Sequence, residues 1–553
     1  MRIFLAACVV ASLVLVVGCG GGGGGATSPT SKTGSIKGVV YAPASGKLAV
    51  KAATTSSDPT RQPVAGATVT LHGYPAITTK TDDTGAFLLQ NVPAGKQTLD
   101  ISFSGYTTLQ VPVKVIAGTQ PTSVTPPNAA AATYKWTVLV YMAADNNLEP
   151  QAILDCKKME RVGSNKDVEV LVQFDRPQAG HHYSSPAITA DANANGLWSG
   201  ARRYQIDYDP TNDPYVMKST MLDDTFDYNA ATGVHNCDMG NPQTLNDFIT
   251  WGQTNYPAQH YLLVVWNHGS GWDPYSDGGT VRTATTTISS IQPKAVAFDD
   301  TSNDAIRDAE LSSALTVRDQ IDVFAMDACL MGMAEVAYQV RHQAGYMVAS
   351  EEETPVDGFA YTDILQKLTS QPSIAPADLA KFMESDAFNT WNALPYYYAT
   401  SSAIDLSQMQ GVADALSPFA QRLKALKGSY PTQLTNAALN TERFSTESGD
   451  SFADLMDYAY HFYDPRANPI SPAVNDDQLR SSAQQLESAI SRAVLHSDTA
   501  GGHPGAHGLS IYFPSPEVYN SPRFGSANVS YPQLEFSTYT HWGSWLAAQP
   551  PQM

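Results

Sequence analysis

The sequence is short of basic side chains, and this shortage excludes one class of partner. Its 553 residues contain 33 Lys and Arg against 53 Asp and Glu, so the formal net charge is −20. Nucleic-acid binding depends on basic side chains that neutralise phosphates, and we therefore expect no nucleic-acid partner. An acidic balance otherwise indicates a well-solvated surface and identifies no substrate.

Several motifs for nucleotide, metal and serine chemistry are absent too. The chain has no P-loop and no glycine-rich dinucleotide fingerprint, and the lack of a G-x-S-x-G elbow disfavours a serine hydrolase. His181 and His182 have no third ligand at regular spacing, which favours a solvent loop over a metal site. Two acidic runs offer oxygen ligands, but neither matches an EF-hand: Asp207, Asp209 and Asp213, and Asp299, Asp300 and Asp304. We expect no metal site and no required cofactor, with calcium possible.

Long apolar runs are confined to the N-terminus. Residues 3–17 are apolar, follow the basic Arg2 and end just before Cys19 and a run of glycines. This arrangement resembles a bacterial lipoprotein signal, in which the cysteine is lipidated and becomes the first mature residue; an ordinary signal peptide is the alternative. We predict a signal peptide over residues 1–19, a flexible linker over 20–33, and a protein of the bacterial cell envelope. It would be lipid-anchored through Cys19 and extracytoplasmic, at the outer membrane or cell surface.

Cysteine is scarce, with five residues in the whole chain. In an oxidising compartment Cys156 and Cys237 could form a disulfide, but two buried thiols fit the sequence equally well. An unpaired Cys329 would be open to oxidation there. Its presence indicates that this thiol is used.

Residues 34–120 contain short runs of alternating apolar and polar residues between glycine-containing turns, which predicts a small β-sandwich. The segments PVAGATV at 63–69, TGAF at 84–87 and VPAG at 92–95 resemble the carboxypeptidase regulatory-like family of transthyretin-like modules. We find no catalytic constellation there and favour a spacer role over binding of a glycan or partner. Residues 121–133, rich in Pro, Thr and Ala, form the predicted interdomain linker.

Strand and helix patterns alternate from residue 134 onward. Strands are predicted at 136–141, 168–174, 261–266, 321–326, 345–349 and 509–513, and helices at 148–162, 244–256, 310–317, 331–342, 450–463 and 478–495. Such alternation predicts an α/β domain over residues 134–553 with a mainly parallel sheet flanked by helices. Residues 402–553 are expected to cover or extend that sheet.

Two of these predicted strands each end in a reactive side chain. His268 follows the apolar run at 261–266, and Cys329 follows the run at 321–326. Ligands collect at the carboxyl ends of parallel strands, so we expect the two side chains to meet at that edge. An imidazole there can act as the base for a thiol nucleophile.

Several separate motifs resemble the clostripain family of cysteine peptidases: VLVYMAADNNL at 138–148, WNHGSGW at 266–272, FDDTS at 298–302, DACLMGMAE at 327–335, ASEE at 349–352 and GAHGLSIYFP at 505–514. The resemblance implies a caspase-like fold and a cysteine endopeptidase acting on protein or peptide substrates. It implies that His268 is the general acid and base and Cys329 the nucleophile of a thioester mechanism. The backbone N–H groups of Gly269 and Cys329 are candidates for the oxyanion hole, and no third catalytic residue is nominated.

Asp327 is the principal candidate for substrate specificity. It lies two residues before Cys329, on the same side of an extended strand end, and the resemblance places it at the base of an S1 pocket that selects Arg or Lys. The alternative is a cap for a helix that begins near residue 331. Ser350 and Glu351 are further candidates for the pocket wall.

Residues 273–297 form a long polar connection beside the predicted site. If the specificity is basic, Arg282 and Lys294 are its possible self-cleavage points. The rival function for the whole chain is an inactive, peptidase-like surface scaffold that binds a glycan or a protein partner.

Overall fold

The computed structural model describes most of the chain, in two compact units, Met1–Ala132 and Thr133–Met553. The described residues are 33–43, 49–51, 61–71, 73–93, 95–103, 109–115, 134–211, 213–224, 226, 228–229, 234–272, 282–283, 286–287, 295–393, 398–444, 451–464, 473–520 and 531–550. The predicted signal peptide with Cys19 lies outside them.

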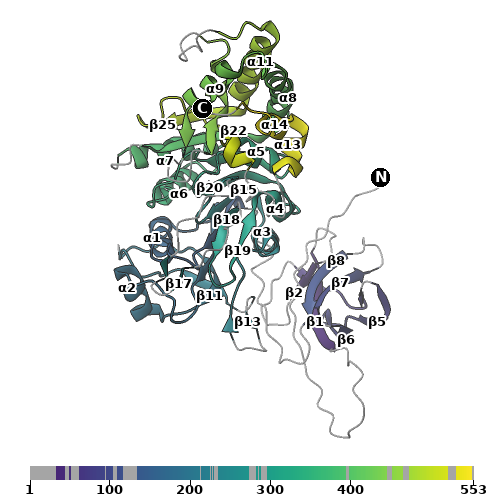
Figure 1. The fold of residues 1–553 in the computed structure, drawn as a ribbon. Helices are drawn as coiled ribbons and strands as arrows, with labels where there is room; N and C mark the ends of the chain where they lie inside the picture. The colour runs from purple at the N-terminus through teal and green to yellow at the C-terminus, as the bar shows by residue number, and fades with distance from the viewer. Residues whose placement is uncertain are drawn as a thin grey trace. The chain divides into compact units, whose positions relative to one another are not determined.

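The first unit is built from two antiparallel sheets of four strands each (Figure 1). In one sheet β1 pairs with β2, β3 and β6, and the other has the order β5-β4-β7-β8. Side chains of β4 alternate between half-buried threonines and the fully buried Val69 and Leu71. The predicted all-β module is thereby confirmed. Its strands are β1 (Thr33–Pro43), β2 (Ala49–Lys51), β3 (Arg61–Pro63), β4 (Thr68–Leu71), β5 (Tyr74–Lys80), β6 (Ala86–Pro93), β7 (Gly95–Ser102) and β8 (Leu109–Val115).

A nine-stranded sheet of order β12-β11-β10-β9-β15-β20-β21-β22-β25 forms the centre of the second unit. The five strands from β10 to β21 run parallel, and two antiparallel strands extend the sheet on each side. The predicted parallel core is confirmed within a mixed sheet. The strands are β9 (Tyr134–Ala143), β10 (Val168–Arg176), β11 (Gly200–Gln205), β12 (Thr220–Asp223), β15 (Ala258–Trp266), β20 (Ile321–Asp327), β21 (Ala344–Ala349), β22 (Thr400–Asp405) and β25 (Val494–Thr499).

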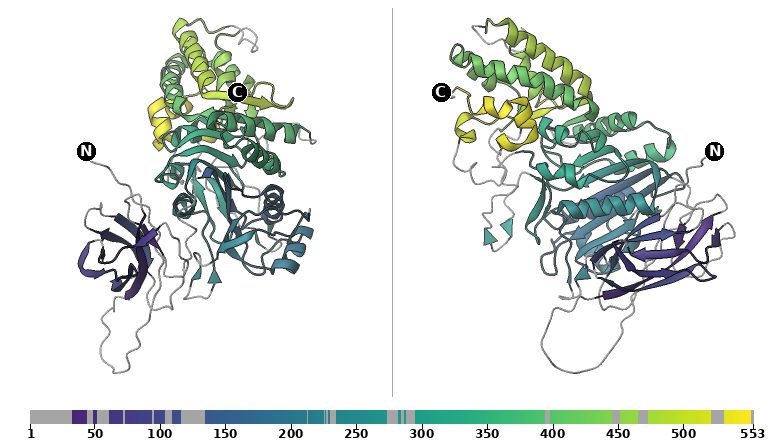
Figure 2. Two further views of the ribbon diagram at one scale, coloured as in Figure 1. Left: turned by 180° about the vertical axis from the view of Figure 1, so that it is seen from behind. Right: turned by 90° about the vertical axis from the view of Figure 1, so that its right-hand side faces the viewer.

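Helices cover both faces of this sheet (Figures 1 and 2). One face packs on α1 (Glu149–Glu160), α2 (Pro186–Asn195), α6 (Tyr361–Ser370) and α7 (Pro376–Asn392). The other packs on α3 (Pro242–Asn255), α4 (Asp308–Ala314), α5 (Ala334–Gln339) and α8 (Met409–Leu426). Alternate residues of β15 supply the two cores: Leu262 and Val264 face the first set of helices, and Leu263 and Val265 the second. The run reads as continuously apolar because both of its faces are buried.

The C-terminal part adds a layer of helices and a small sheet of order β23-β24-β26. The helix predicted at 450–463 is only partly correct, because residues 452–454 pair with 510–512 as strands and the helix starts after them. The elements are α9 (Pro431–Asn440), β23 (Arg443–Phe444), β24 (Phe452–Asp454), α10 (Leu455–Tyr460), α11 (Asp477–Ala493), β26 (Ser510–Tyr512), α12 (Pro516–Tyr519), α13 (Glu535–Thr540) and α14 (Trp542–Leu546).

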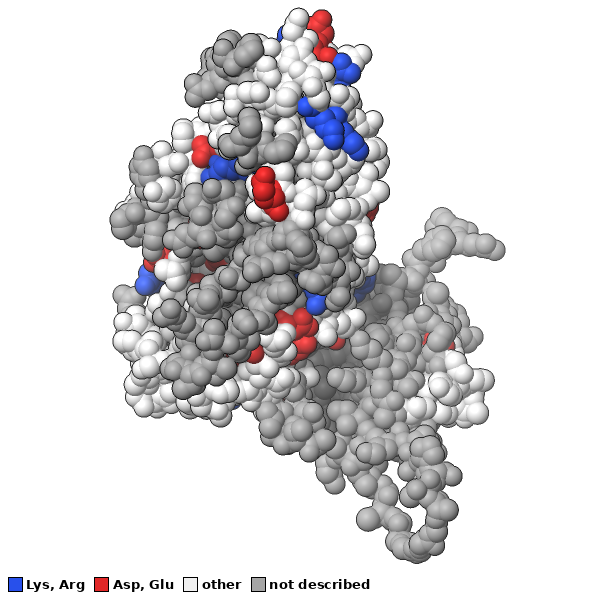
Figure 3. Space-filling view, in the orientation of Figure 1, with Lys and Arg blue, Asp and Glu red and all other residues white. Residues whose placement is uncertain are grey.

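Short elements complete the unit: the hairpins β13 (Tyr228–Asn229) with β14 (Val234–His235), β16 (Arg282–Thr283) with β17 (Thr286–Thr287) and β18 (Ala295–Asp299) with β19 (Asp304–Arg307), and the 3-10 turns Leu406–Gln408 and Tyr531–Gln533. Among the described residues, no helix is long and apolar enough to cross a membrane. On the face drawn in Figure 3, the described surface carries basic and acidic side chains only in small, separate groups.

Candidate active site

Two adjacent parallel strands deliver His268 and Cys329 to the same edge of the sheet. In the register of β15 and β20, Trp266 lies opposite Asp327. His268 lies two residues after Trp266, and Cys329 lies two residues after Asp327. Neighbouring strands are about 4.8 Å apart. The offset that places His268 beyond β15 therefore places Cys329 beside it beyond β20.

The backbones of the two loops touch at Gly269. A Cβ atom on this residue would lie 2.4 Å from the carbonyl oxygen of Cys329 and 3.1 Å from the Cβ of Ala328. Only glycine allows such an approach without a shift of the backbone. The close contact fixes the loop that carries His268 against the loop that carries Cys329.

The turn after Cys329 is held in a strained conformation. Leu330 has a positive φ of 65°, which is uncommon for a residue with a side chain. Its N–H donates to the carbonyl of Glu352 at 3.2 Å, and the N–H of Gly332 donates to the carbonyl of Ser350 at 2.7 Å. These bonds keep the chain extended, so α5 begins at Ala334 and not at 331 as the sequence predicted.

Burial favours the neutral forms of both candidate residues. It raises the pKa of the Cys329 thiol to about 12, against a lowering by the hydrogen bond to Thr354, while Glu353, Glu352 and Asp327 raise it further. The thiol donates to the carbonyl of Thr354 at 3.9 Å. Burial lowers the pKa of His268 to about 4. At neutral pH the resting site therefore holds a thiol and an uncharged imidazole.

Asn147 is a further site residue, which the sequence analysis missed. It lies just beyond β9, the strand next to β15, and its Oδ1 is 2.7 Å from Nε2 of His268. With the amide oxygen as acceptor, Nε2 carries the proton and Nδ1 keeps its lone pair. The available signal was its place in the VLVYMAADNNL motif, at the carboxyl end of a parallel strand.

Asp327 is a buried carboxylate at the end of β20, with 5% of its surface exposed. Its Oδ2 accepts hydrogen bonds from the N–H of Phe359 at 3.0 Å and from the hydroxyl of Tyr361 at 2.9 Å. Burial raises its pKa, against these two hydrogen bonds. It caps no helix, since α5 starts seven residues later with Met333 at its N-cap. The predicted alternative role of Asp327 as a helix cap is wrong.

Asp327 shares its surroundings with a second carboxylate and one ammonium group. A Cβ on Gly358 would lie 2.8 Å from Oδ2 of Asp327 and 3.3 Å from Oδ2 of Asp155. Lys158 pairs with Asp155 at 2.7 Å. Burial, and after it Asp327, raise the pKa of Asp155 to about 7, while Lys158 lowers it. When both acids are ionised, these three groups carry one net negative charge, which suits a single cationic partner.

Comparison with known proteins identifies the family. The Clostripain family model matches residues 140–539, which is most of the chain. The chain belongs to the clostripain family. It is therefore a cysteine peptidase, a hydrolase that acts on proteins or peptides. A CarboxypepD_reg-like domain matches residues 54–133. Both predicted family resemblances are confirmed.

Two relatives show how far this likeness extends. Clostripain from Hathewaya histolytica is 25% identical over 436 residues, which cover 71% of this chain and 77% of that protein. A secreted C11 cysteine protease from Bacteroides thetaiotaomicron, solved with an irreversible peptide inhibitor, is 20% identical. It has a TM-score of 0.50 over 74% of this chain and 99% of its own, and the two chains share the fold.

In this clostripain-family chain, Ser350 and Glu351 directly follow β21, which runs parallel beside β20, the strand that ends at Asp327. The hydroxyl of Ser350 is 3.0 Å from that of Thr400 on β22. Glu351 accepts the N–H of Gly508 at 2.8 Å, and its pKa is raised well above the usual range by burial and then by Asp454. Both side chains are buried, as Asp327 is, and their place in the pocket wall stays a prediction. Which way they point past the strand end could not be read from spacing.

The remaining candidates also have defined surroundings. Cys156 packs in the core on one face of the sheet and Cys237 in the core on the other, so they form no disulfide with each other. His181 and His182 lie in the loop before α2, and His181 is exposed as predicted. The side chain of His182 instead turns inward: it is 7% exposed, and its Nδ1 is 2.7 Å from Glu149. Lys294 lies outside the described residues, as does the side chain of Arg282.

The two predicted acidic runs have different settings. Asp209 pairs with Lys157 at 2.6 Å. Asp207 accepts the N–H of Thr220 at the start of β12, and Asp213 accepts that of Tyr215. Asp299 instead gathers with Asp145 and Asp175, with one oxygen of each within 4.8 Å of the others. Burial, followed by Asp145, raises the pKa of Asp299 to about 7.

Proposed function

We propose that this peptidase is an endopeptidase that uses His268 and Cys329 as its catalytic pair and cleaves after Arg or Lys. The observation that carries the proposal is the convergence of the two residues from adjacent parallel strands, with their loops in backbone contact. A nucleophile and a base side by side at a sheet edge are what covalent catalysis of acyl transfer needs.

His268 acts as the general base and then as the general acid. As Sγ of Cys329 attacks the scissile carbonyl carbon, Nδ1 of His268 takes the thiol proton, while Nε2–H stays bonded to Asn147. The same proton then passes to the leaving amine, the C–N bond breaks, and a thioester remains on Cys329. Water, deprotonated by His268, hydrolyses the thioester and restores the thiol.

The N–H groups of Gly269 and Cys329 are proposed to bind the oxyanion of the tetrahedral intermediate. Their support is the direct contact between the two backbone segments, which no side chain at 269 obstructs. Donors already fixed in place lower the barrier because they need no reorganisation during the reaction.

Asp327 is proposed to receive the side chain of a P1 Arg or Lys. Its support is the place of Asp327 at the end of β20, two residues from Cys329 and close to Asp155 and Lys158 of α1. With both acids ionised, the three groups carry one net negative charge. A cation bound there would also stabilise the ionised form of a carboxylate whose pKa burial has raised.

The chain is proposed to act outside the cytoplasm, held to a membrane by lipid on Cys19. The sequence of residues 1–25 supports this, with its apolar run, the cysteine and the glycine tether. The N-terminal module then serves as a spacer between the anchor and the peptidase unit.

Peptide hydrolysis by this pair is proposed to need no cofactor, and calcium is a possible structural ligand. Asp145, Asp175 and Asp299 fit calcium in donor type, because the ion prefers oxygen ligands and carboxylates above all. If calcium binds there, melting temperature and activity will fall together on treatment with a chelator and recover when the ion is restored.

A peptidyl electrophile with a P1 Arg tests the catalytic pair. The account predicts one adduct, mapped by mass spectrometry to Cys329, and slow labelling of His268→Ala. The buried Cys156 and Cys237 serve as internal controls and should stay unmodified. An adduct on either of them in the folded protein, with none on Cys329, would contradict the proposal.

A further inference from the structure

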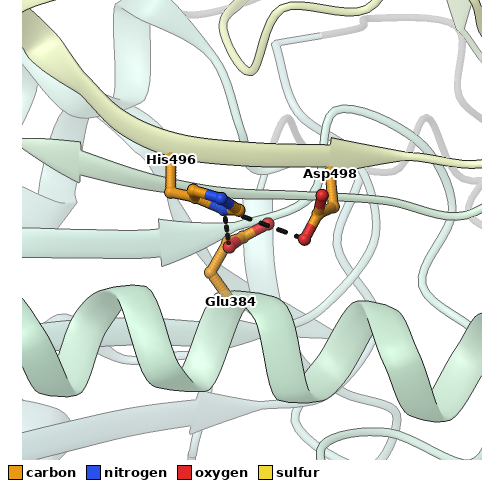
Figure 4. A group of neighbouring side chains, drawn as sticks. All are labelled: Glu384, His496 and Asp498. Carbon is orange, nitrogen blue, oxygen red and sulfur yellow. Dashed lines mark hydrogen bonds and ion pairs between the residues drawn. The ribbon is translucent and has the colours of Figure 1, made fainter.

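Helix α7 and the edge strand β25 bring together three side chains of the kinds that bind metal ions. Glu384 comes from the middle of α7, and His496 and Asp498 are alternate residues of β25, on the same face of the strand. Figure 4 shows the three side chains converging, with both dashed contacts meeting at the imidazole. Nδ1 of His496 is 2.6 Å from Glu384 Oε2 and 3.7 Å from Asp498 Oδ2. One ligand atom from each residue lies within 4.8 Å of the others.

The carboxylate of Glu384 is fully buried but only half satisfied. Its Oε2 accepts the hydroxyl of Ser385 at 2.9 Å and faces His496. Its Oε1 is buried and has no hydrogen-bond partner among the described residues. Burial raises the pKa of this carboxyl; the hydrogen bond from His496 opposes the shift, and Asp498 adds to it. A buried carboxylate oxygen without a donor is costly, and a cation offsets that cost directly.

A second buried oxygen lies on the neighbouring strand β22: the Oγ of Ser401. Ser401 of β22 pairs with Asp498 of β25 in the antiparallel register, so the two side chains share a face. Ser401 is 2% exposed, and its Oγ has no hydrogen-bond partner in the part of the chain that the structure describes. Two buried oxygens, both without a partner in the described ranges, therefore belong to the face on which Glu384, His496 and Asp498 meet. An ordinary hydrogen-bonded Glu–His pair does not account for either of them.

We propose that Glu384, His496 and Asp498 bind a divalent transition-metal ion of the zinc type, with Oγ of Ser401 as an additional oxygen donor. An imidazole nitrogen with two carboxylates favours Zn²⁺ over calcium or magnesium, which prefer oxygen alone. His496 is 46% and Asp498 33% exposed, so water can complete the coordination on the open side. The ion would join α7 to the last strand of the sheet, and its role would be structural.

Zinc titration of the purified chain, followed by calorimetry and by the melting temperature, tests this site. The expected result is one ion bound at this site and a melting temperature that rises with zinc concentration. Both effects should vanish in His496→Ala and in Glu384→Gln, and Ser401→Ala should weaken binding. Cys329→Ala, measured in parallel, separates any zinc held by the thiol and His268 from zinc at this site.

His260→Ala is the matched control. His260 also has Nδ1 beside a carboxylate, Asp322 at 2.9 Å, and is 34% exposed, but among the described residues Asp322 is its one acidic partner. The His260→Ala variant should bind zinc as the unaltered chain does. The proposal is overturned if the chain binds no zinc, or if His496→Ala and Glu384→Gln bind it as the unaltered chain does.

Discussion

At the scale of single residues, the charge state of the resting site decides its response to pH. The thiol of Cys329 has its pKa raised to about 12, chiefly by burial, and His268 has its pKa lowered to about 4 by burial. A neutral pair predicts slow alkylation by iodoacetamide at pH 7, with a rate that keeps rising above pH 9. A thiolate–imidazolium pair would instead give a plateau from about pH 5 upward, and that profile would contradict the account.

The contact between Asn147 and His268 makes a second prediction at this scale. Asn147→Ala removes the acceptor for Nε2–H, so the imidazole loses its fixed orientation and kcat should fall by about 10- to 100-fold with KM little changed. Asn147→Asp keeps an acceptor and adds a negative charge, so activity should be retained and the acid limb of the pH profile should move upward. A substitution by alanine that leaves kcat and the pH profile unchanged would remove Asn147 from the site.

Side-chain direction is the feature of the site that spacing did not reveal. The strands that carry His268 and Cys329 could be predicted from their apolar runs, because burial on both faces leaves a plain signal. For Ser350 and Glu351, sequence position gives no information on side-chain direction; in the structure the first contacts Thr400 and the second accepts the N–H of Gly508. Asn147 could not be predicted from the sequence, because a single amide beyond a strand indicates no function until its hydrogen-bond partner, here His268, is known.

At the scale of elements, the contact between the loops that carry His268 and Cys329 depends on the absence of a side chain at Gly269. Gly269→Ala would place a Cβ 2.4 Å from the carbonyl of Cys329, and backbone must move to relieve it. We expect kcat/KM to fall by about 100-fold, because a displacement near 1 Å costs that much in a positioned reaction.

Gly411→Ala provides the matched control for this substitution. Gly411 lies in α8, and a Cβ there meets nothing within 4 Å. Alanine should therefore leave activity unchanged and add up to about 1 kcal/mol of stability. Equal activities of the two alanine variants would show that the backbone contact at Gly269 does not matter for catalysis.

The elements that were predicted with wrong boundaries share one cause. The helix predicted from residue 331 starts later because Leu330 and Gly332 are bonded to the segment after β21. Residues 452–454 become a strand because 510–512 lie alongside them. In both places a hydrogen-bond partner distant in sequence overrides a local helical pattern, and such a partner cannot be predicted from local periodicity.

At the scale of the whole molecule, buried carboxyl groups set the dependence of stability on pH. Burial is the largest cause that raises the pKa of Glu169, Asp299 and Glu335 to about 7. A folded-state pKa above the unfolded value of about 4 means that folding favours the protonated form. This stability is present at low pH and is lost as the pH rises from about 4 through 7.

Two histidines also shape the dependence of stability on pH, and their pKa values are shifted in opposite directions. Hydrogen bonds and charge from Glu352 and Glu442 outweigh burial and raise the pKa of His503 to about 9, so its contribution is complete below about 6.5 and is lost as the pH rises through 9. His268, with its lowered pKa, costs stability as the pH falls from about 6.5 to 4. Together with the carboxyl groups, these shifts predict a maximum of stability at mildly acidic pH.

Scanning calorimetry between pH 5 and 9 checks this prediction. The melting temperature should fall steadily above about pH 6, and Glu335→Gln should flatten the slope, because the amide keeps an acceptor for Tyr531 without a charge. Glu517→Gln, at an exposed position of α12, should leave the slope as it is. A melting temperature that rises from pH 5 to 8 would contradict the conclusion that buried carboxyl groups with raised pKa values set this dependence.

Hydrolysis of short peptide amides that differ only at P1 tests the central claim most directly. The series would end in Arg, Lys, Leu, Asn or Asp, and the unaltered chain would be compared with Cys329→Ala and Asp327→Asn. The asparagine keeps an acceptor for Phe359 and Tyr361 while removing the charge. The account predicts cleavage after Arg and Lys, abolished in the first variant and reduced by about 100-fold in the second. Cleavage that survives loss of the thiol, or a preference for Arg and Lys that survives loss of the carboxylate, would contradict it.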